Sequence, residues 1–120
     1  MGDPTTNAAI RDHFEDDASP YVATDAPGNG NDTVVPANTR THVVTPDGTN
    51  SVDLDSAARE GHVVTVVHAS GGSNTPAVSF TDGDFVGTGP SDLGNAGATA
   101  TLLNTDGSTS GWVVLATGSA

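Results

Sequence analysis

Histidine and aspartate are the residue types of this chain that could bind a metal ion or transfer protons. The histidines are His13, His42, His62 and His68. His62 and His68 fall on one expected strand, where each residue advances the chain by about 3.3 Å, so their side chains lie roughly 20 Å apart. They therefore cannot bind one ion together, and we interpret them as histidines at a strand end or at an interface.

The acidic turn Asp82-Gly83-Asp84 is the other candidate for metal binding. Carboxylate and carbonyl oxygens are the ligands that Ca²⁺ and Na⁺ prefer. The turn is not an EF-hand loop, which needs a longer run that ends in glutamate. A solvated acidic turn is the favoured interpretation, so Asp82 and Asp84 are weak metal candidates, and we expect no cofactor.

Motifs for covalent catalysis or phosphate binding are missing from the sequence. Cysteine is absent, which excludes disulfides and thiolate catalysis, and no Gly-x-Ser-x-Gly elbow occurs. The Gly-rich segment 87–97 lacks the lysine and the strand-to-helix context of a phosphate loop. We therefore expect no enzymatic activity.

Two interpretations of segment 87–97 stay open. It is either a flexible connection or a variable exposed tip that binds a partner. The residues that would bind in the second case are Gly87, Thr88, Ser91, Asp92 and Asn95.

Trp112 is expected to anchor the core, because one large ring supplies much of the buried area of a small domain. A tryptophan that stacks on a sugar is the alternative.

The charge balance is extreme. Fifteen acidic residues face Arg11, Arg40 and Arg59 with no lysine, which gives a formal net charge of −12. Such self-repulsion destabilises a compact chain unless salt screens it, and at 1 M salt the Debye length is about 3 Å. The composition predicts a protein of a salt-loving archaeon rather than a disordered acidic segment, because its valine-rich runs are regular. Nucleic acid and anionic membrane are excluded as direct partners, since no basic patch exists.

The length of 120 residues suits one compact domain plus an arm. Only 34% of residues are hydrophobic and 4% are aromatic, so the core must be thin and the protein is expected to work in an assembly. The chain has no stretch like a signal peptide and no run of the roughly 20 apolar residues that span a membrane. We expect synthesis in the host cytoplasm.

Residues 1–40 are expected to form an N-terminal docking arm. Asp3 and Pro4 suit the start of a short helix, on which Ile10 and Phe14 share one face. The segment 19–33, rich in proline and glycine, is expected to be an extended loop. The residues predicted to dock the arm on a capsid are Ile10, Arg11, Phe14, Tyr21 and Arg40.

Residues 41–120 are expected to form an all-β domain, a small β-sandwich or jelly roll of about seven short strands. Strands at 41–45 and near 52–54 would form a hairpin around the Asp47-Gly48 turn. A helical turn is expected at 56–60 and a central strand at 62–69. A strand at 76–81 follows, and a second hairpin joins 98–104 to 111–117. No internal repeat of solenoid period is visible.

A fixed order of elements runs from residue 52 to residue 115. It consists of Glu60-Gly61 before the strand 62–68, a Gly/Ser turn at 70–73, an alternating strand at 77–80, a glycine loop, Gly-Ala-Thr-Ala-Thr-Leu at 97–102, and Asp106-Gly107 before Gly111-Trp112-Val113-Val114-Leu115. This order resembles small β-modules of tailed-virus particles, namely head-decoration proteins and fibre tips. The resemblance implies a trimeric, non-enzymatic protein that is mounted on a virion through an N-terminal arm.

These observations together predict a capsid decoration protein on the virion surface of a tailed virus that infects a halophilic archaeon. The expected partners are other copies of the chain, as a homotrimer, and the major capsid protein. The alternative is a tail-fibre or spike tip that binds a glycan or protein of the host cell surface through segment 87–97.

Overall fold

The computed structural model describes residues 22–69 and 76–119. Residues 1–21, 70–75 and 120 lie outside this description, and with them the expected helix near Ile10 and Phe14. The strands are β1 (Val22–Asp25), β2 (Thr33–Val34), β3 (Thr41–Val44), β4 (Thr49–Asp53), β5 (Val63–His68), β6 (Ala77–Ser79), β7 (Thr99–Asn104) and β8 (Trp112–Gly118). Two short 3₁₀ turns complete the set, η1 (Asp55–Ala57) and η2 (Asp82–Asp84).

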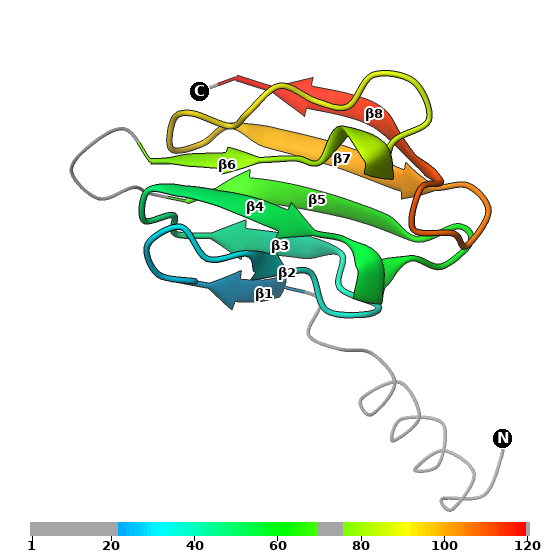
Figure 1. The fold of residues 1–120 in the computed structure, drawn as a ribbon, viewed down its shortest axis with the longest axis horizontal. Helices are drawn as coiled ribbons and strands as arrows, with labels where there is room; N and C mark the ends of the chain where they lie inside the picture. Colours follow the sequence, from blue (N-terminus) through cyan, green and yellow to red (C-terminus); the bar gives the residue numbers. More distant parts are fainter. Residues whose placement is uncertain (1–21, 70–75, 120) are drawn as a thin grey trace, which may run out of the picture.

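The strands form two sheets, which confirms the predicted all-β class (Figure 1). The larger sheet has the order β1-β3-β5-β7-β8 and the smaller one the order β2-β4-β6. Buried residues of both sheets, such as Val66 and Leu102 of the larger and Val52 and Val78 of the smaller, belong to one hydrophobic cluster. The core therefore lies between two layers.

The first six strands wind as a parallel coil, with one strand in each sheet per turn. β1, β3 and β5 pair in parallel in the larger sheet, and β2, β4 and β6 pair in parallel in the smaller sheet. Val22 pairs with Thr41 and Thr33 pairs with Val52, so both partners lie 19 positions further along the chain. This is a structural repeat that the sequence pattern did not reveal, because its later turns are longer: Thr49 pairs with Ala77.

The prediction of a hairpin around Asp47-Gly48 is wrong. β3 and β4 belong to different sheets, and the turn carries the chain across the core from one sheet to the other. The physical reason is that Val44 and Val52 are both buried, and they face the same core from opposite layers. Gly48 has a positive φ of 70°, which glycine adopts without strain.

The expected extended loop at 19–33 is also corrected by the structure. Residues 22–25 form β1, which pairs with β3, and Thr33 and Val34 form β2, which pairs with β4. Strands on both sides of residue 40 therefore share the same two sheets. The Gly28 and Gly30 turns, both with positive φ, make the corner between β1 and β2.

The C-terminal part of the coil is closed by the predicted second hairpin, which the structure confirms. β7 pairs antiparallel with β5 and β8 pairs antiparallel with β7, with an irregularity between Thr101 and Leu102. The loop from β6 to β7 contacts this hairpin where Phe85 bridges to Trp112, and its Leu93 bridges back to Val78 of β6. The opposite end of the coil, at β1 and β2, has no further strand in the described residues (Figure 1).

Candidate functional site

The docking residues predicted for the arm can be traced only in part. Ile10, Arg11, Phe14 and Tyr21 lie outside the described residues. Arg40 is exposed immediately before β3, and its carbonyl oxygen accepts a hydrogen bond from the Thr65 amide at 2.8 Å.

Most of segment 87–97 is exposed, including the five residues that were predicted to bind a partner. Gly87, Thr88, Ser91, Asp92 and Asn95 are all exposed. Leu93, between them, is only 4% exposed and pairs with Val78 through two backbone hydrogen bonds of 2.9 and 2.8 Å. The segment is therefore fastened at its middle, with short exposed stretches on each side.

Asp82 and Asp84 lie on η2, where Asp82 is exposed and Asp84 is half-buried. Burial raises the pKa of the Asp84 carboxyl, and the nearby charges of Asp55 and Asp53 raise this pKa further. Within 22–69 and 76–119, no group of three or more histidine or acidic residues is placed to hold a metal ion. We interpret this corner as a region of like-charge repulsion.

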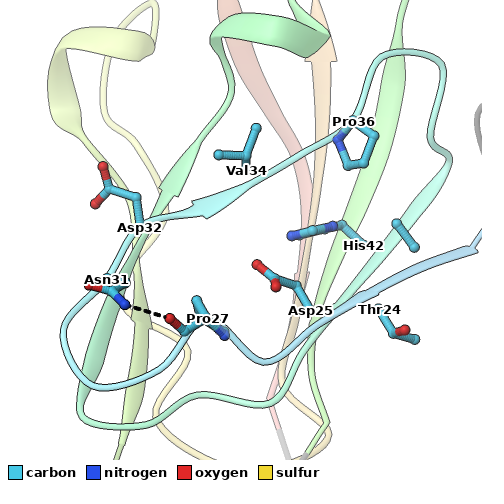
Figure 2. Close-up of a pocket in the computed structure, with 9 residues that line it drawn as sticks. Thr24, Asp25, Pro27, Asn31, Asp32, Val34, Pro36 and His42 are labelled. Carbon is cyan, nitrogen blue, oxygen red and sulfur yellow. Dashed lines mark hydrogen bonds between the residues drawn. The ribbon is translucent and has the colours of Figure 1, made fainter.

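A groove of about 530 Å³ opens beside the edge of β1, at the end of the coil that β1 and β2 form. We call it the rim groove (Figure 2). Its lining consists of Ala23, Thr24, Asp25, Pro27, Asn31, Asp32, Val34, Pro36 and His42. Asp25 and His42 point toward the same space between β1 and β2 in Figure 2. The Asn31 amide nitrogen donates to the Pro27 carbonyl oxygen at 2.8 Å, which holds the corner of the loop.

Asp25, Thr33 and His42 form a linear hydrogen-bonded chain behind the groove. The Thr33 hydroxyl donates to Oδ2 of Asp25 at 2.7 Å and lies 2.8 Å from Nε2 of His42. A hydroxyl has one proton, so Nε2 of His42 must donate to Thr33, and the ring is the Nε2–H tautomer. Nδ1 of His42 is buried without a hydrogen-bond partner.

This arrangement does not activate Thr33 as a nucleophile. A base must accept the hydroxyl proton for such activation, whereas here the imidazole donates and the proton points to a carboxylate. Thr33 is also 0% exposed, so no substrate reaches it. Burial lowers the pKa of His42, and the charge of Asp25 opposes this effect only in part. The three side chains fix β1, β2 and β3 to one another.

The outward face of the five-stranded sheet is the largest feature that the sequence analysis missed. Strand pairing aligns its outward side chains in rows, the first of which is Val22, Thr41, Thr65, Thr101 and Ala116. The second row is Thr24, Val43, Val67, Thr99 and Gly118. A third, shorter row is Val63, Leu103 and Val113. We call this surface the Val/Thr face.

No residue in these rows carries a charge. The acidic residues of the described segments lie in loops and turns, except Asp25, which points into the coil, and Asp53 on β4 of the other sheet. The side chains of the Val/Thr face are half-buried or exposed, with Val22 at 54% and Val63 at 41%. A sheet face that meets water usually alternates to polar residues. An uncharged face on a chain of net charge −12 is therefore a candidate contact surface.

The alternating pattern that produces this face is visible in the sequence, but it predicts a strand that is buried on both sides. Valine and threonine fill the outward alternate positions of 63–68, and threonine and leucine fill those of 99–103. A strand that is apolar on both sides indicates burial between two layers, and β5 does lie in the middle of its sheet. Only the inner side of β5 is covered by the second sheet, so the sequence pattern predicted the strand but not its free face.

The remaining aromatic and histidine candidates are structural. Trp112 is 0% exposed, so the sugar-stacking alternative is wrong and the predicted core anchor is confirmed. The His62 ring lies 5.9 Å from the Trp112 ring, and its Nδ1 and Nε2 atoms lie 2.7 and 2.6 Å from the carbonyl oxygens of Ala57 and Thr39. His68 ends β5, where its Nε2 donates to the Pro76 carbonyl oxygen at 3.1 Å.

No helix with the length and apolar character needed to cross a membrane occurs in the part of the chain that the structure describes. No family model, curated protein or solved structure matches this chain. Its function is therefore inferred from its own residues and geometry.

Proposed function

We propose that this protein is a non-enzymatic structural component of a virus particle, a decoration protein on the head of a tailed virus that infects a halophilic archaeon. The observation that carries the proposal is the separation of charge on its surface. The Val/Thr face is free of charged side chains, while the acidic residues of the described segments, except the inward-pointing Asp25, lie on the turns, the loops and the other sheet. This distribution suits a building block that is packed against protein on one side and hydrated by brine on the other.

The order of elements from residue 52 to residue 115, which resembles head-decoration and fibre-tip modules, supports the same proposal. The mechanism is additive burial, because many copies that each make a small contact stabilise a shell together. Binding to the assembled form and not to free subunits shifts the equilibrium toward the closed particle. The major capsid protein is the proposed partner for this binding.

A tail-fibre or spike tip is the second candidate, and a specific observation favours it. The two exposed stretches of segment 87–97 flank the buried Leu93, so polar groups of Thr88, Ser91, Asp92 and Asn95 are presented on a fastened loop. Exposed polar loops on a rigid scaffold are a common way to bind a receptor. In this case the host cell surface is the proposed partner.

Immunoelectron microscopy of virus particles purified in molar salt, with an antibody raised against the whole protein, separates these proposals. Labelling over the entire head supports the decoration protein, and labelling at the tail tip alone supports the fibre or spike tip. Particles from a culture that lacks the gene serve as the control. Absence of the protein from purified particles, checked by mass spectrometry of the same preparation, would contradict both.

A further inference from the structure

We infer that the Val/Thr face binds other copies of this same chain. The face lies on the outer side of β1, β3, β5, β7 and β8, and the second sheet packs on the inner side. Apolar side chains such as Val22 and Val63 are therefore left in contact with solvent. This exposure is notable because only 34% of the residues in the chain are hydrophobic.

Charge selects a second copy as the occupant. Two copies carry the same net charge of −12, so contact through the turns, the loops or the smaller sheet would bring carboxylates together. Like charges that meet in an interface oppose association strongly. Contact through the Val/Thr face brings valine and threonine against valine and threonine and keeps the acidic residues of both copies at the periphery.

Two polar groups in the middle of the face are paired with each other, which lowers the cost of covering them. The hydroxyls of Thr65 and Thr101 lie 2.9 Å apart across β5 and β7 and form a hydrogen bond with each other. A buried hydroxyl without a partner would cost free energy on association. This pair lies in the middle row of the face, where a neighbouring copy would cover it, and each of its two oxygens already has one hydrogen-bond partner.

The size of the face predicts association that depends on concentration. Five strands about 4.8 Å apart and three rows of side chains span roughly 20 Å by 20 Å, which is of the order of 400 Å² for each copy. A stable interface of standard size buries about 800 Å² per partner. The contact should therefore build up as the protein concentration rises, at a salt concentration that screens the charges of the rim.

The chain offers a matched pair of variants to test this inference. Thr65 and Thr101 have a counterpart on the outer side of the smaller sheet, where the Ser51 and Ser79 hydroxyls lie 3.1 Å apart across β4 and β6. Thr65→Arg and Ser51→Arg each break one such hydroxyl pair and add one bulky cation in the middle of a sheet. Only Thr65→Arg alters the Val/Thr face.

The measurement is sedimentation equilibrium of the full chain in molar salt over a wide range of concentrations, with circular dichroism to verify the fold of each variant. We expect the wild type and Ser51→Arg to associate to the same mass, and Thr65→Arg to need at least roughly tenfold more protein to do so. The gentler variant Thr65→Ser keeps a hydroxyl and should associate as the wild type does.

Two results would overturn the inference. One is a wild-type chain that stays monomeric at every concentration. The other is association that Thr65→Arg leaves unchanged in a folded variant. Self-association and particle labelling are independent readouts, so failure of the virion proposal leaves this inference standing, and the reverse also holds.

Discussion

Buried polar side chains do much of the packing in this thin core. Thr33, His42, Asn50, His68 and Asn104 are each no more than 2% exposed, and they lie where strands meet turns. A buried polar group destabilises a fold unless it is hydrogen-bonded. Each of these side chains makes at least one hydrogen bond, although Nδ1 of His42 and Nδ1 of His68 have none. The corners of the coil are therefore held by directional contacts rather than by apolar bulk.

His42 should make stability depend on pH in weak acid. Burial lowers the pKa of His42 below its ordinary value of 6.5, so the unfolded chain takes up a proton more readily than the folded chain does. The contribution of His42 to stability is fully present above pH 6.5 and is lost as the pH falls below it. One proton of difference corresponds to a loss of up to about 1.4 kcal/mol per pH unit.

The test compares the pH dependence of urea unfolding for the wild type and His42→Gln between about pH 7.5 and pH 5.5, above the range where exposed carboxylates titrate. The variant should lose less free energy of unfolding over this interval, whatever its stability at pH 7.5. The other histidines are the same in both proteins, so the difference isolates His42. Equal slopes would show that His42 is not responsible.

At the scale of elements, Asn50 links two successive turns of the coil. Its Nδ2 atom donates to the carbonyl oxygens of Gly28 at 2.8 Å and Asn31 at 2.7 Å, and its Oδ1 atom accepts from the Asp47 amide at 2.8 Å. The β1–β2 corner is thus tied to the β3–β4 corner by one side chain. One side chain therefore holds two neighbouring turns together, as backbone hydrogen bonds hold neighbouring strands together inside a sheet.

Asn50→Ala should destabilise the protein by about 2–4 kcal/mol, since it removes three hydrogen bonds that contribute roughly 0.5–1.5 kcal/mol each. Denaturant unfolding measures this change. Asn95→Ala, at an exposed position of the segment 87–97, is the control and should stay within about 0.5 kcal/mol of the wild type. A small effect of Asn50→Ala would mean that water replaces the amide and that the corners are held by the strands alone.

Secondary structure was predictable from the sequence where local signals decide it. The strands at 41–44, 63–68, 77–79, 99–104 and 112–118 fall where alternation and turn residues placed them, whereas the helical turn expected at 56–60 is shorter and lies at 55–57. The pairing of strands was not predictable, because an Asp-Gly turn at Asp47 and Gly48 fits a hairpin as well as a crossing between layers. β1 and β2 were missed because four-residue and two-residue strands between proline and glycine carry little periodicity.

The candidate site was predicted less well than the fold, for a physical reason. Asp25, Thr33 and His42 come together only through the parallel pairing of β1 with β3 and through the packing of the two sheets. Their spacing along the chain has no motif. The exposure of segment 87–97 was predicted from its glycines alone, because a loop without apolar periodicity has no reason to be buried.

At the scale of the whole molecule, acidity makes the folded state depend on salt. Asp84 illustrates the effect, because burial raises the pKa of its carboxyl and the charges of Asp55 and Asp53, which salt can screen, raise this pKa further. The ionised form of Asp84 is thus less favourable in the folded chain than in the unfolded chain, and it destabilises the fold at neutral pH. Screening weakens this repulsion when the Debye length falls from about 10 Å at 0.1 M salt to about 3 Å at 1 M.

Transfer from molar salt to about 0.1 M salt should therefore lower the melting temperature of the wild type, measured by circular dichroism. Asp84→Asn should be more stable than the wild type at low salt, by less than about 1 kcal/mol because the carboxyl is only partly buried, and the gain should shrink in molar salt. Asp92→Asn, on the exposed loop, is the control and should show a smaller gain. A melting temperature that does not change with salt would contradict this account and would favour specific cation binding.

The 19-residue offset shared by the first two turns has one more consequence. Because β1 and β2 have the same offset to their partners, a second copy of residues 22–40 inserted before Thr41 would enter both sheets in register. Each insertion would lengthen the coil by one strand spacing, about 4.8 Å, without touching the hairpin that closes its other end. Such a chain can change its length in fixed increments, so the distance between its two ends can evolve by duplication of a short segment.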